Sequence, residues 1–221
     1  MNKTYIVVPA YCEAERIGPV LDILVKYPYQ IIVVDDGSKD DTFLVAKSRS
    51  AVISLKHKIN LGKGAAMKTG CEAALCLGAE NIVVMDADGQ HRPEDVTRFI
   101  KKLATGDEIV FGKRDFSRGM PAMMALGNTT LSNLIRILFN IEIADTQNGF
   151  RAFTALAYQK IKWQAAKYDV ETEMVVNAGR AKLKYGQVTI PTIYLDNYKG
   201  TTLFDGVKIL LKIIKWKIIK K

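Results

Sequence analysis

Two aspartates separated by one small residue end the apolar run in VVMDADGQH, residues 83–91. A strand that stays buried has no structural need for Asp86 and Asp88 at its end. Carboxylate oxygens suit Mg²⁺ and Mn²⁺, and Mg²⁺ commonly links one or two carboxylates to substrate phosphates. We therefore expect a divalent-metal site formed by Asp86, Asp88 and Gln90. Capping of the next helix is the alternative, but Pro93 puts the predicted helix start further along the chain.

The elements that must position this pair alternate along the first half of the chain. Continuous apolar runs predict buried strands, and the segments between them have helical spacing. This alternation predicts an α/β protein with a mainly parallel central sheet and helices on both faces. The predicted strands are residues 4–9, 31–36, 51–56, 81–86, 108–114 and 186–196, and the predicted helices include residues 16–27, 40–50, 64–78, 93–104 and 120–139.

Polar residues gather at the carboxyl ends of the predicted strands, where ligands bind in open parallel sheets. Tyr11 and Glu13 follow the first strand, Asp36 ends the second, and Lys63 lies between two glycines after the third. A dinucleotide-binding protein would have GxGxxG after the first strand, where this chain has PAYCEA, and NLGKGAA lacks P-loop spacing. Helix capping by Glu13, a turn at Asp36 and a solvated Lys63 remain alternatives.

Eight stretches of the chain resemble, in the same order, the motifs of family 2 glycosyltransferases, in particular the polyprenyl-phosphate (dolichyl-phosphate) mannose or glucose synthase-like group. The resemblance covers residues 4–204. It implies a GT-A fold that binds a nucleotide sugar, and inverting sugar transfer that depends on Mg²⁺ or Mn²⁺. The stretches are PAYCEAERI, VVDDGSKDDT, NLGKGAAMKTG, VVMDADGQHRPED, GKRD, LGNTTLSNLIR, DTQNGFRAF and YDVETEM.

The same resemblance implies roles for residues at matching positions. Asp145 and Asp88 would be catalytic, and Asp145 would face the acceptor. The donor would be a GDP- or UDP-sugar, and the acceptor a polyprenyl or dolichyl phosphate. The implied donor-binding residues are Pro9, Tyr11, Glu13, Val34, Asp36, Lys63, Asp86, Ala87 and Arg114, the implied metal ligands are Asp86, Asp88 and Gln90, and the implied acceptor-side residues are Asn128, Ser132, Arg151, Glu171 and Glu173.

The nature of the acceptor decides what Asp145 must do. A lipid phosphate is already anionic near neutral pH, so Asp145 would position it or stabilise oxocarbenium character. A hydroxyl of a glycolipid, polysaccharide or protein would instead need a carboxylate base. Both possibilities stay open at this point. In either reaction the departing nucleoside diphosphate gains negative charge, which a metal ion and Arg114 would stabilise.

The distribution of charge separates this chain from nucleic-acid-binding domains. The 221 residues are 48% hydrophobic and carry a formal net charge of +9. Seven lysines and one aspartate lie from residue 199 onward, so +6 of this charge belongs to the tail. A nucleic-acid-binding domain usually spreads basic residues over its folded body, so we expect no nucleic-acid partner. The three cysteines show no metal-binding spacing, and the first residues lack the layout of a signal peptide, so we expect a cytoplasmic protein.

The tail, FDGVKILLKIIKWKIIKK, has the period of an amphipathic helix. We predict a catalytic domain over residues 1–203 and a basic helix over residues 204–221. Broad apolar surface, a lysine stripe and one tryptophan are typical of a helix that lies on an anionic bilayer, where each lysine contributes about 1 kcal/mol. We therefore expect peripheral association with the cytoplasmic face of a membrane. Packing of one apolar face on the catalytic domain is the alternative.

Overall fold

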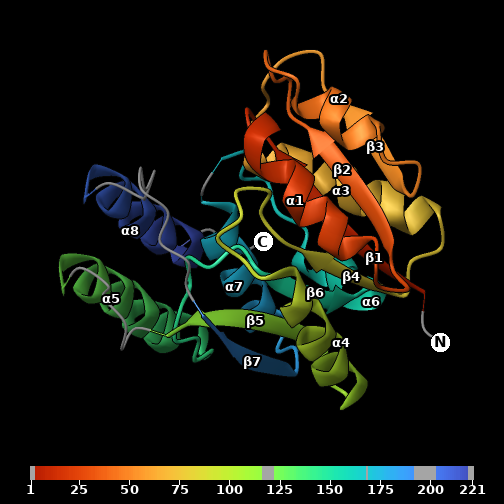
Figure 1. Cartoon of the computed structure of the whole chain (residues 1–221). Helices are drawn as coiled ribbons and strands as arrows, with labels where there is room; N and C mark the ends of the chain where they lie inside the picture. The colour runs from red at the N-terminus through yellow and green to blue at the C-terminus, as the bar shows by residue number, and fades with distance from the viewer. Residues whose placement is uncertain (1–2, 116–121, 168, 192–202, 219–221) are drawn as a thin grey trace.

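The computed structural model describes residues 3–115, 122–167, 169–191 and 203–218 (Figure 1). Residues 1–2, 116–121, 168, 192–202 and 219–221 lie outside this description, as do the side chains of residues 122–126 and 203–207. The last residues of the predicted strand 186–196 therefore fall outside the described part of the chain.

Within the described residues, seven strands form one sheet in the order β3-β2-β1-β4-β6-β5-β7. β6 is antiparallel to both of its neighbours, β4 and β5, and every other neighbouring pair is parallel. The expected mainly parallel sheet is therefore confirmed. The strands are β1 (Thr4–Ala10), β2 (Gln30–Asp35), β3 (Val52–Lys56), β4 (Asn81–Val84), β5 (Ile109–Arg114), β6 (Arg151–Thr154) and β7 (Tyr185–Ile190).

Helices cover both faces of the sheet, which explains why its central strands are apolar without alternation. Tyr5 and Val7 of β1 pack into a core cluster with α3, α5, α6, α7 and α8. Ile6 and Val8 of the same strand pack against α1, α2 and α4 on the opposite face. The helices are α1 (Ala14–Leu24), α2 (Thr42–Lys47), α3 (Lys63–Cys76), α4 (Val96–Ala104), α5 (Ala122–Phe139), α6 (Ala155–Ile161), α7 (Val170–Arg180) and α8 (Leu203–Ile218), with a 3₁₀ turn at Pro93–Asp95.

The reversed strand β6 determines which loop joins the edge of the sheet where the parallel strands end. Its first residue, Arg151, pairs with Val84 at the end of β4. Because the two strands run in opposite directions, the residues before β6 lie at the edge where β4 and β5 end. The loop of residues 145–150 is thereby brought next to Asp86. The sequence pattern did not predict β6, because it is four residues long and continues directly into α6.

The C-terminal helix α8 packs along α5 and also contacts α7 (Figure 1). Ile209 and Ile213 are buried in the core cluster, and Lys212 forms a 2.5 Å ion pair with Asp169. One apolar face of α8 is thus part of the folded body. No helix of the described residues is long and apolar enough to cross a bilayer. The predicted division of the chain at residues 203 and 204 stays a prediction.

Gly70 of α3 allows that helix to lie close to the sheet. A Cβ atom at this position would lie 2.4 Å from Val7 Cγ1 and 3.2 Å from Val34 Cγ2. We expect Gly70→Ala to lower the free energy of unfolding by about 1–3 kcal/mol through overpacking. Gly127→Ala is the matched control, since no described residue lies within 4 Å of its added methyl group. Chemical denaturation should show the control unchanged or more stable, and equal stability of the two variants would contradict this packing.

Candidate active site

The loops after β1 and β2 are tied together at the carboxyl edge of the sheet. The amide of Cys12, which has φ 55°, donates to Ser38 Oγ at 2.9 Å, and the amide of Glu13 donates to Thr42 Oγ1 at 2.8 Å. Tyr11 is exposed beside them. The expected donor-binding residues Tyr11 and Glu13 are therefore placed at the ligand-binding edge by contacts with the next loop.

Asp36 is buried and its carboxylate holds the loop that leads to α3. Its Oδ1 lies 2.7 Å from His57 Nδ1 and accepts a bond from the Leu61 amide at 2.9 Å. Its Oδ2 accepts from the Gly62 amide at 2.7 Å. This carboxylate, expected to contact the base or ribose, thus positions the residue immediately before Lys63. Contact with a nucleoside stays a prediction.

Three further residues expected to bind the donor have buried side chains. Pro9 and Val34 are paired neighbours in β1 and β2, and Val34 packs in the core cluster. Ala87, between the two aspartates, is buried in the cluster on the other face. These residues belong to the buried strand ends beneath the polar side chains, and their expected contacts with the donor remain predictions.

Asp86, Lys63 and Glu171 form a chain of ion pairs at the centre of this edge. Lys63 Nζ lies 2.7 Å from Asp86 Oδ1 and 2.8 Å from Glu171 Oε1. The lysine begins α3, the aspartate follows β4 and the glutamate lies in the first turn of α7. Three predicted site residues that are far apart in the sequence are thus brought into contact.

The pKa values of these groups respond to burial and to one another. Burial lowers the pKa of Lys63, but Asp86 and Glu171 outweigh it, so the pKa is raised overall. Burial raises the pKa of Asp86, but Lys63 and His91 outweigh that effect and lower it. For Asp88, burial and the nearby Asp86 charge act together to raise the pKa. The two aspartates are therefore electrostatically unequal: Asp86 has an ion-pair partner, whereas Asp88 has none among the described residues.

A divalent cation would supply the charge that Asp88 lacks. Asp88 Oδ1 accepts the Gln90 amide at 2.9 Å, which shapes the loop around the two carboxylates. At Gly149, a Cβ atom would lie 2.5 Å from Asp86 Oδ2, so the backbone approaches this oxygen closely and leaves no room for a side chain. Among the described residues, no group of three or more His, Cys, Asp or Glu side chains is placed to hold a metal. The donor set therefore fits an ion that takes its remaining oxygen ligands from phosphate and water, as Mg²⁺ commonly does.

Asp145 and Arg114 form a two-bond ion pair beside this acidic site. Arg114 donates from Nε and Nη2 to the two carboxylate oxygens of Asp145, at 2.6 Å and 2.9 Å. The amides of Arg114 and Gln147 also donate to this carboxylate. Asp145 is fully buried, whereas the Arg114 side chain is 15% exposed. Two residues expected on different substrates are thus in direct contact, and the carboxylate is held in one orientation.

Arg151 is fully buried beneath the site. Its guanidinium donates to the main-chain oxygens of Asn148, Glu171 and Thr146 and stacks 5.2 Å from the ring centre of Phe111. Burial lowers its pKa to about 10, although nearby acidic groups oppose this effect. In the described structure Arg151 joins the loop before β6 to the start of α7. A contact with the acceptor stays a prediction.

The remaining acceptor-side candidates lie at three different places. Glu173 is buried and accepts the amides of Gln164 and Ala165, the latter at 2.7 Å. Asn128 donates from Nδ2 to Ala144 O at 2.8 Å, which fixes the loop before Asp145. Ser132, one turn further along α5, lines a pocket.

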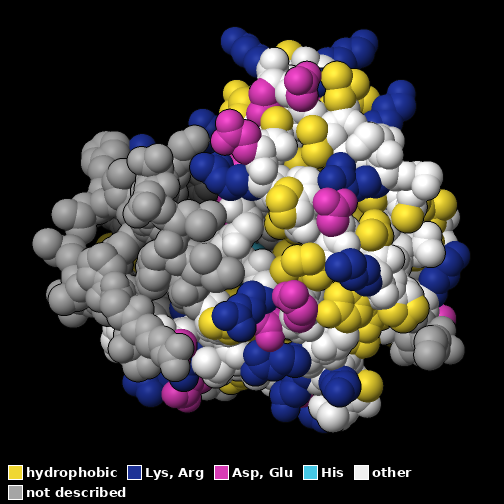
Figure 2. Space-filling view, in the orientation of Figure 1, with side chains coloured by type: hydrophobic (Ala, Val, Ile, Leu, Met, Phe, Trp, Pro, Cys, Tyr) yellow, Lys and Arg dark blue, Asp and Glu magenta, His cyan; other side chains and the backbone are white. Residues whose placement is uncertain are grey.

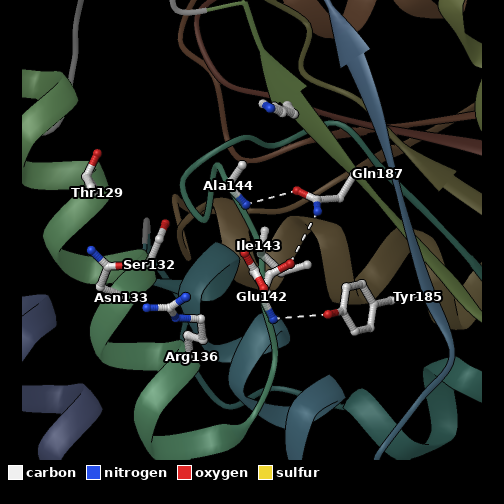
Figure 3. Close-up of a pocket in the computed structure, with 10 residues that line it drawn as sticks. Thr129, Ser132, Asn133, Arg136, Glu142, Ile143, Ala144, Tyr185 and Gln187 are labelled. Atoms are coloured by element: carbon white, nitrogen blue, oxygen red, sulfur yellow. Dashed lines mark hydrogen bonds between the residues drawn. The ribbon is translucent and has the colours of Figure 1, made fainter.

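This pocket has a volume of about 570 Å³ and lies between α5, β7 and the loop of residues 142–144 (Figure 3). Two hydrogen bonds hold the loop against β7: the Ala144 amide donates to Gln187 Oε1, and the Glu142 amide donates to Tyr185 Oη. Asp86 and Asp88 do not line it, so it is separate from the predicted metal site. Its lining residues are Lys113, Thr129, Ser132, Asn133, Arg136, Glu142, Ile143, Ala144, Tyr185 and Gln187.

Two pocket residues, Tyr185 and Gln187, and one residue beside Asp86, Gly149, were missed in the sequence-based prediction. Tyr185 and Gln187 belong to a strand whose edge position gave no sign of a pocket. Gly149 precedes the unpredicted strand β6, and its closeness to Asp86 became visible only with that strand in place. A glycine directly after Asn148 in a loop with acidic and basic residues was the available signal, since glycine often marks close approach of the backbone to another group.

Comparisons with known sequences identify the family. The sequence profile described as Glycosyl transferase family 2 matches residues 5–161. A protein of Methanococcus voltae named UDP-N-acetylglucosamine–dolichyl-phosphate N-acetylglucosaminyltransferase is 34% identical over 98% of this chain and 96% of its own length. An uncharacterized protein of Methanocaldococcus jannaschii is 37% identical, with 98% and 93% covered. The polyprenol monophosphomannose synthase of Mycolicibacterium smegmatis is 26% identical, with 98% and 88% covered.

Solved structures agree on the fold. Glucosyl-3-phosphoglycerate synthase from Mycobacterium tuberculosis, in complex with Mn²⁺, uridine diphosphate and phosphoglyceric acid, superimposes with a TM-score of 0.77 at 19% identity. The match covers all of this chain and 80% of that protein. The chain belongs to glycosyl transferase family 2. The expected family, GT-A fold and glycosyltransferase activity are thereby confirmed.

Substitution of Gly149 tests whether the Asp86–Lys63 pair belongs to the reacting centre. A Cβ atom there would lie 2.5 Å from Asp86 Oδ2 and 2.9 Å from Lys63 Nζ, so one of them must move. Misplacement of a site group by about 1 Å can cost about 10²-fold in rate. We expect Gly149→Ala to reduce sugar transfer by that order, with circular dichroism and the unfolding midpoint close to wild type. Gly127→Ala is the control and should keep its rate; a fully active Gly149→Ala enzyme would remove Asp86 from the reacting centre.

Proposed function

We propose that this glycosyltransferase moves a sugar, with inversion, from a GDP- or UDP-sugar to a polyprenyl or dolichyl phosphate, using Mg²⁺ or Mn²⁺. The observation that carries the proposal is the acidic pair after β4, where Lys63 pairs with Asp86 and Asp88 has no ion-pair partner among the described residues. Near-full-length similarity to the Methanococcus voltae enzyme, whose name specifies a dolichyl-phosphate acceptor, supports the lipid phosphate.

In this proposal, Asp86, Asp88 and Gln90 hold the metal, and the loops with Tyr11, Glu13 and Asp36 surround the nucleoside. The metal, when bound, stabilises the negative charge of the departing diphosphate. Arg114 provides a fixed positive charge next to the same edge, because its guanidinium is oriented by Asp145. A charge that is already oriented stabilises a developing anion without reorganisation.

The ion pair between Asp145 and Arg114 supports an acceptor that needs no general base. Its two oxygens accept the Arg114 guanidinium, and it is fully buried. Both carboxylate oxygens are engaged by the arginine, so the group is held in place as the partner of Arg114. A lipid phosphate is anionic and requires no deprotonation, whereas a hydroxyl would. We assign Asp145 to positioning Arg114 and the acceptor, and a hydroxyl acceptor is the alternative.

The pocket beside α5 is suited to an anionic group of the acceptor. Lys113 and Arg136 line it together with one acid, Glu142. Ser132 adds a hydroxyl whose Oγ is buried and has no hydrogen-bond partner among the described residues. The loop that forms one wall continues directly to Asp145. Because Asp145 pairs with Arg114, an acceptor phosphate bound near this pocket would lie close to Arg114.

The exposed side of α8 supports contact with a membrane surface. Leu211, Ile214 and Ile218 are 61%, 42% and 76% exposed, while the opposite face packs on the body. Lys208, at the start of the described side chains, and Lys215 are exposed on the same helix. Elsewhere, on the face shown in Figure 2, basic side chains are dispersed among acidic and apolar ones. We infer peripheral binding to the cytoplasmic face of an anionic bilayer, and no nucleic-acid partner.

The central test is transfer of a radiolabelled sugar. Purified protein is incubated with labelled GDP- and UDP-sugars, Mg²⁺ or Mn²⁺, and polyprenyl phosphate in detergent. We expect label in the organic phase in an acid-labile form, because a sugar attached through a phosphate at its anomeric carbon hydrolyses in mild acid. Asp88→Asn should reduce the rate by about 10²-fold or more, since it removes a metal-binding charge.

The alternatives give different results in the same assay. Label in an acid-stable product of an added glycolipid or polysaccharide would indicate a hydroxyl acceptor. Full activity of folded Asp88→Asn would contradict the metal site. Lys47→Gln is the control for a charge change, because Lys47 lies at the end of α2 and takes no part in the site.

Membrane contact is tested at the exposed face of α8. Leu211→Gln, Ile214→Gln and Ile218→Gln together keep the buried Ile209 and Ile213. Each large aliphatic side chain moved from water into lipid contributes about 1.5–3 kcal/mol, so affinity for vesicles with phosphatidylglycerol should fall by about 10²-fold or more. Vesicle sedimentation measures this change. The control replaces three apolar side chains exposed elsewhere, Leu44, Ile59 and Leu156; equal effects of the two triple variants would contradict binding through α8.

A further inference from the structure

On the basis of the metal site assigned in the proposed function, we propose that Lys63 is a built-in counter-ion that competes with the divalent metal for Asp86. Lys63 Nζ lies 2.7 Å from Asp86 Oδ1. An ammonium group and a divalent ion that both contact this small carboxylate would repel each other strongly at such distances. In the donor-free protein the lysine therefore weakens metal binding, and the metal joins Asp86 only when it displaces the lysine.

The position of Lys63 in α3 shows that helix stability does not account for it. Lys63 is the first residue of α3. A positive charge is unfavourable at a helix N-terminus, where the helix dipole is itself positive. The neighbouring carboxylates Asp86 and Glu171 compensate for this unfavourable position. The lysine is thus placed for its contact with the acidic site.

The glycines on either side of Lys63 let the backbone approach a second segment closely. A Cβ atom on Gly62, which has φ 99°, would lie 2.3 Å from Ala166 O, and one on Gly64 would lie 2.1 Å from Ala165 O. The Gly64 amide donates to Ala166 O, and Trp163 Nε1 donates to Gly64 O, both at 2.8 Å. This contact fixes the direction from which the lysine side chain enters the site.

The helix α7 stabilises both the lysine and its second partner. Glu173 accepts the amides of Gln164 and Ala165, which holds the segment that presses on Gly62 and Gly64. Two residues earlier, Glu171 binds Lys63 directly. A small displacement of α7 would therefore move Lys63 and Glu171 together.

Glu171 allows Lys63 to leave Asp86 without losing every partner. Its Oε1 lies 2.8 Å from Lys63 Nζ. Its Oε2 is buried and has no hydrogen-bond partner among the described residues, so it is an additional acceptor. A buried cation without a partner would be strongly unfavourable. With Glu171 in place, the exchange of lysine for metal at Asp86 keeps the ammonium paired.

The test measures Mn²⁺ binding by the full chain without nucleotide, using electron paramagnetic resonance of free Mn²⁺. Lys63→Met should increase the affinity by about tenfold, because the competitor is gone, while Lys63→Arg should stay near wild type. Glu171→Gln should weaken binding by about threefold, because Lys63 then has only Asp86. In the Lys63→Met background the Glu171→Gln change should have little effect, which a double-mutant cycle reveals.

The double variant Lys63→Met with Glu171→Gln is charge-balanced and keeps the test valid should the single Lys63 variant fold poorly. Mn²⁺ affinity of both Lys63→Met variants equal to or below wild type would overturn the competition. Adding uridine or guanosine diphosphate separates the two proposals. If Asp88→Asn abolishes nucleotide-dependent Mn²⁺ binding but Lys63→Met does not raise Mn²⁺ affinity, the metal site stands and only the competition by Lys63 is refuted. If Asp88→Asn leaves Mn²⁺ binding unchanged in every variant, the metal site itself is refuted.

Discussion

Acidic side chains that are largely withdrawn from water require positive charge, and this requirement organises the carboxyl edge of the sheet. Asp86, Asp145 and Glu171 are mostly withdrawn from water; Lys63 pairs with both Asp86 and Glu171, and Arg114 pairs with Asp145. Lys63 begins α3 and Arg114 ends β5. Breaking one partner from such a pair costs about 3–5 kcal/mol, because the remaining charge stays buried. The pairs therefore fix the relative positions of elements that the sheet alone would leave adjustable.

The reversed strand β6 makes this charge arrangement possible. In a fully parallel sheet, the residues before a strand would lie at the opposite edge from the acidic pair. The antiparallel direction of β6 brings Asp145 to Arg114 and Gly149 to Asp86. Arg151, at the start of the same strand, then joins this loop to α7 through main-chain oxygens. One short strand thus connects the acidic pair after β4 to the helix that carries Glu171 and Glu173.

The sequence pattern was sufficient for the parallel part of the fold, because strands covered on both faces are apolar throughout and separated by helices. It also located the acidic pair, since two carboxylates one residue apart after a buried strand are typical of a divalent-cation site. β6 could not be predicted, because four residues are too few for a period. The hydrogen-bond partners of Asp36 and Glu173 could not be predicted either. Both carboxylates accept main-chain amides from segments whose approach depends on tertiary packing. Side-chain type alone does not distinguish such a residue from one that binds substrate.

The helix α5 links the two halves of the proposed reaction. Ser132 and Arg136 line the pocket, whereas Ile137, the next residue, is 74% exposed beside the packed helix α8. An isoprenoid phosphate has an apolar chain that stays in lipid and an anionic group that must leave it. The exposed Ile137 and the polar, basic residues that face the pocket match this division. Asn128 on the same helix holds Ala144, next to Asp145. If the protein binds a bilayer as proposed, one helix and one short loop would join that surface to Arg114, which is an arrangement suited to a lipid phosphate acceptor.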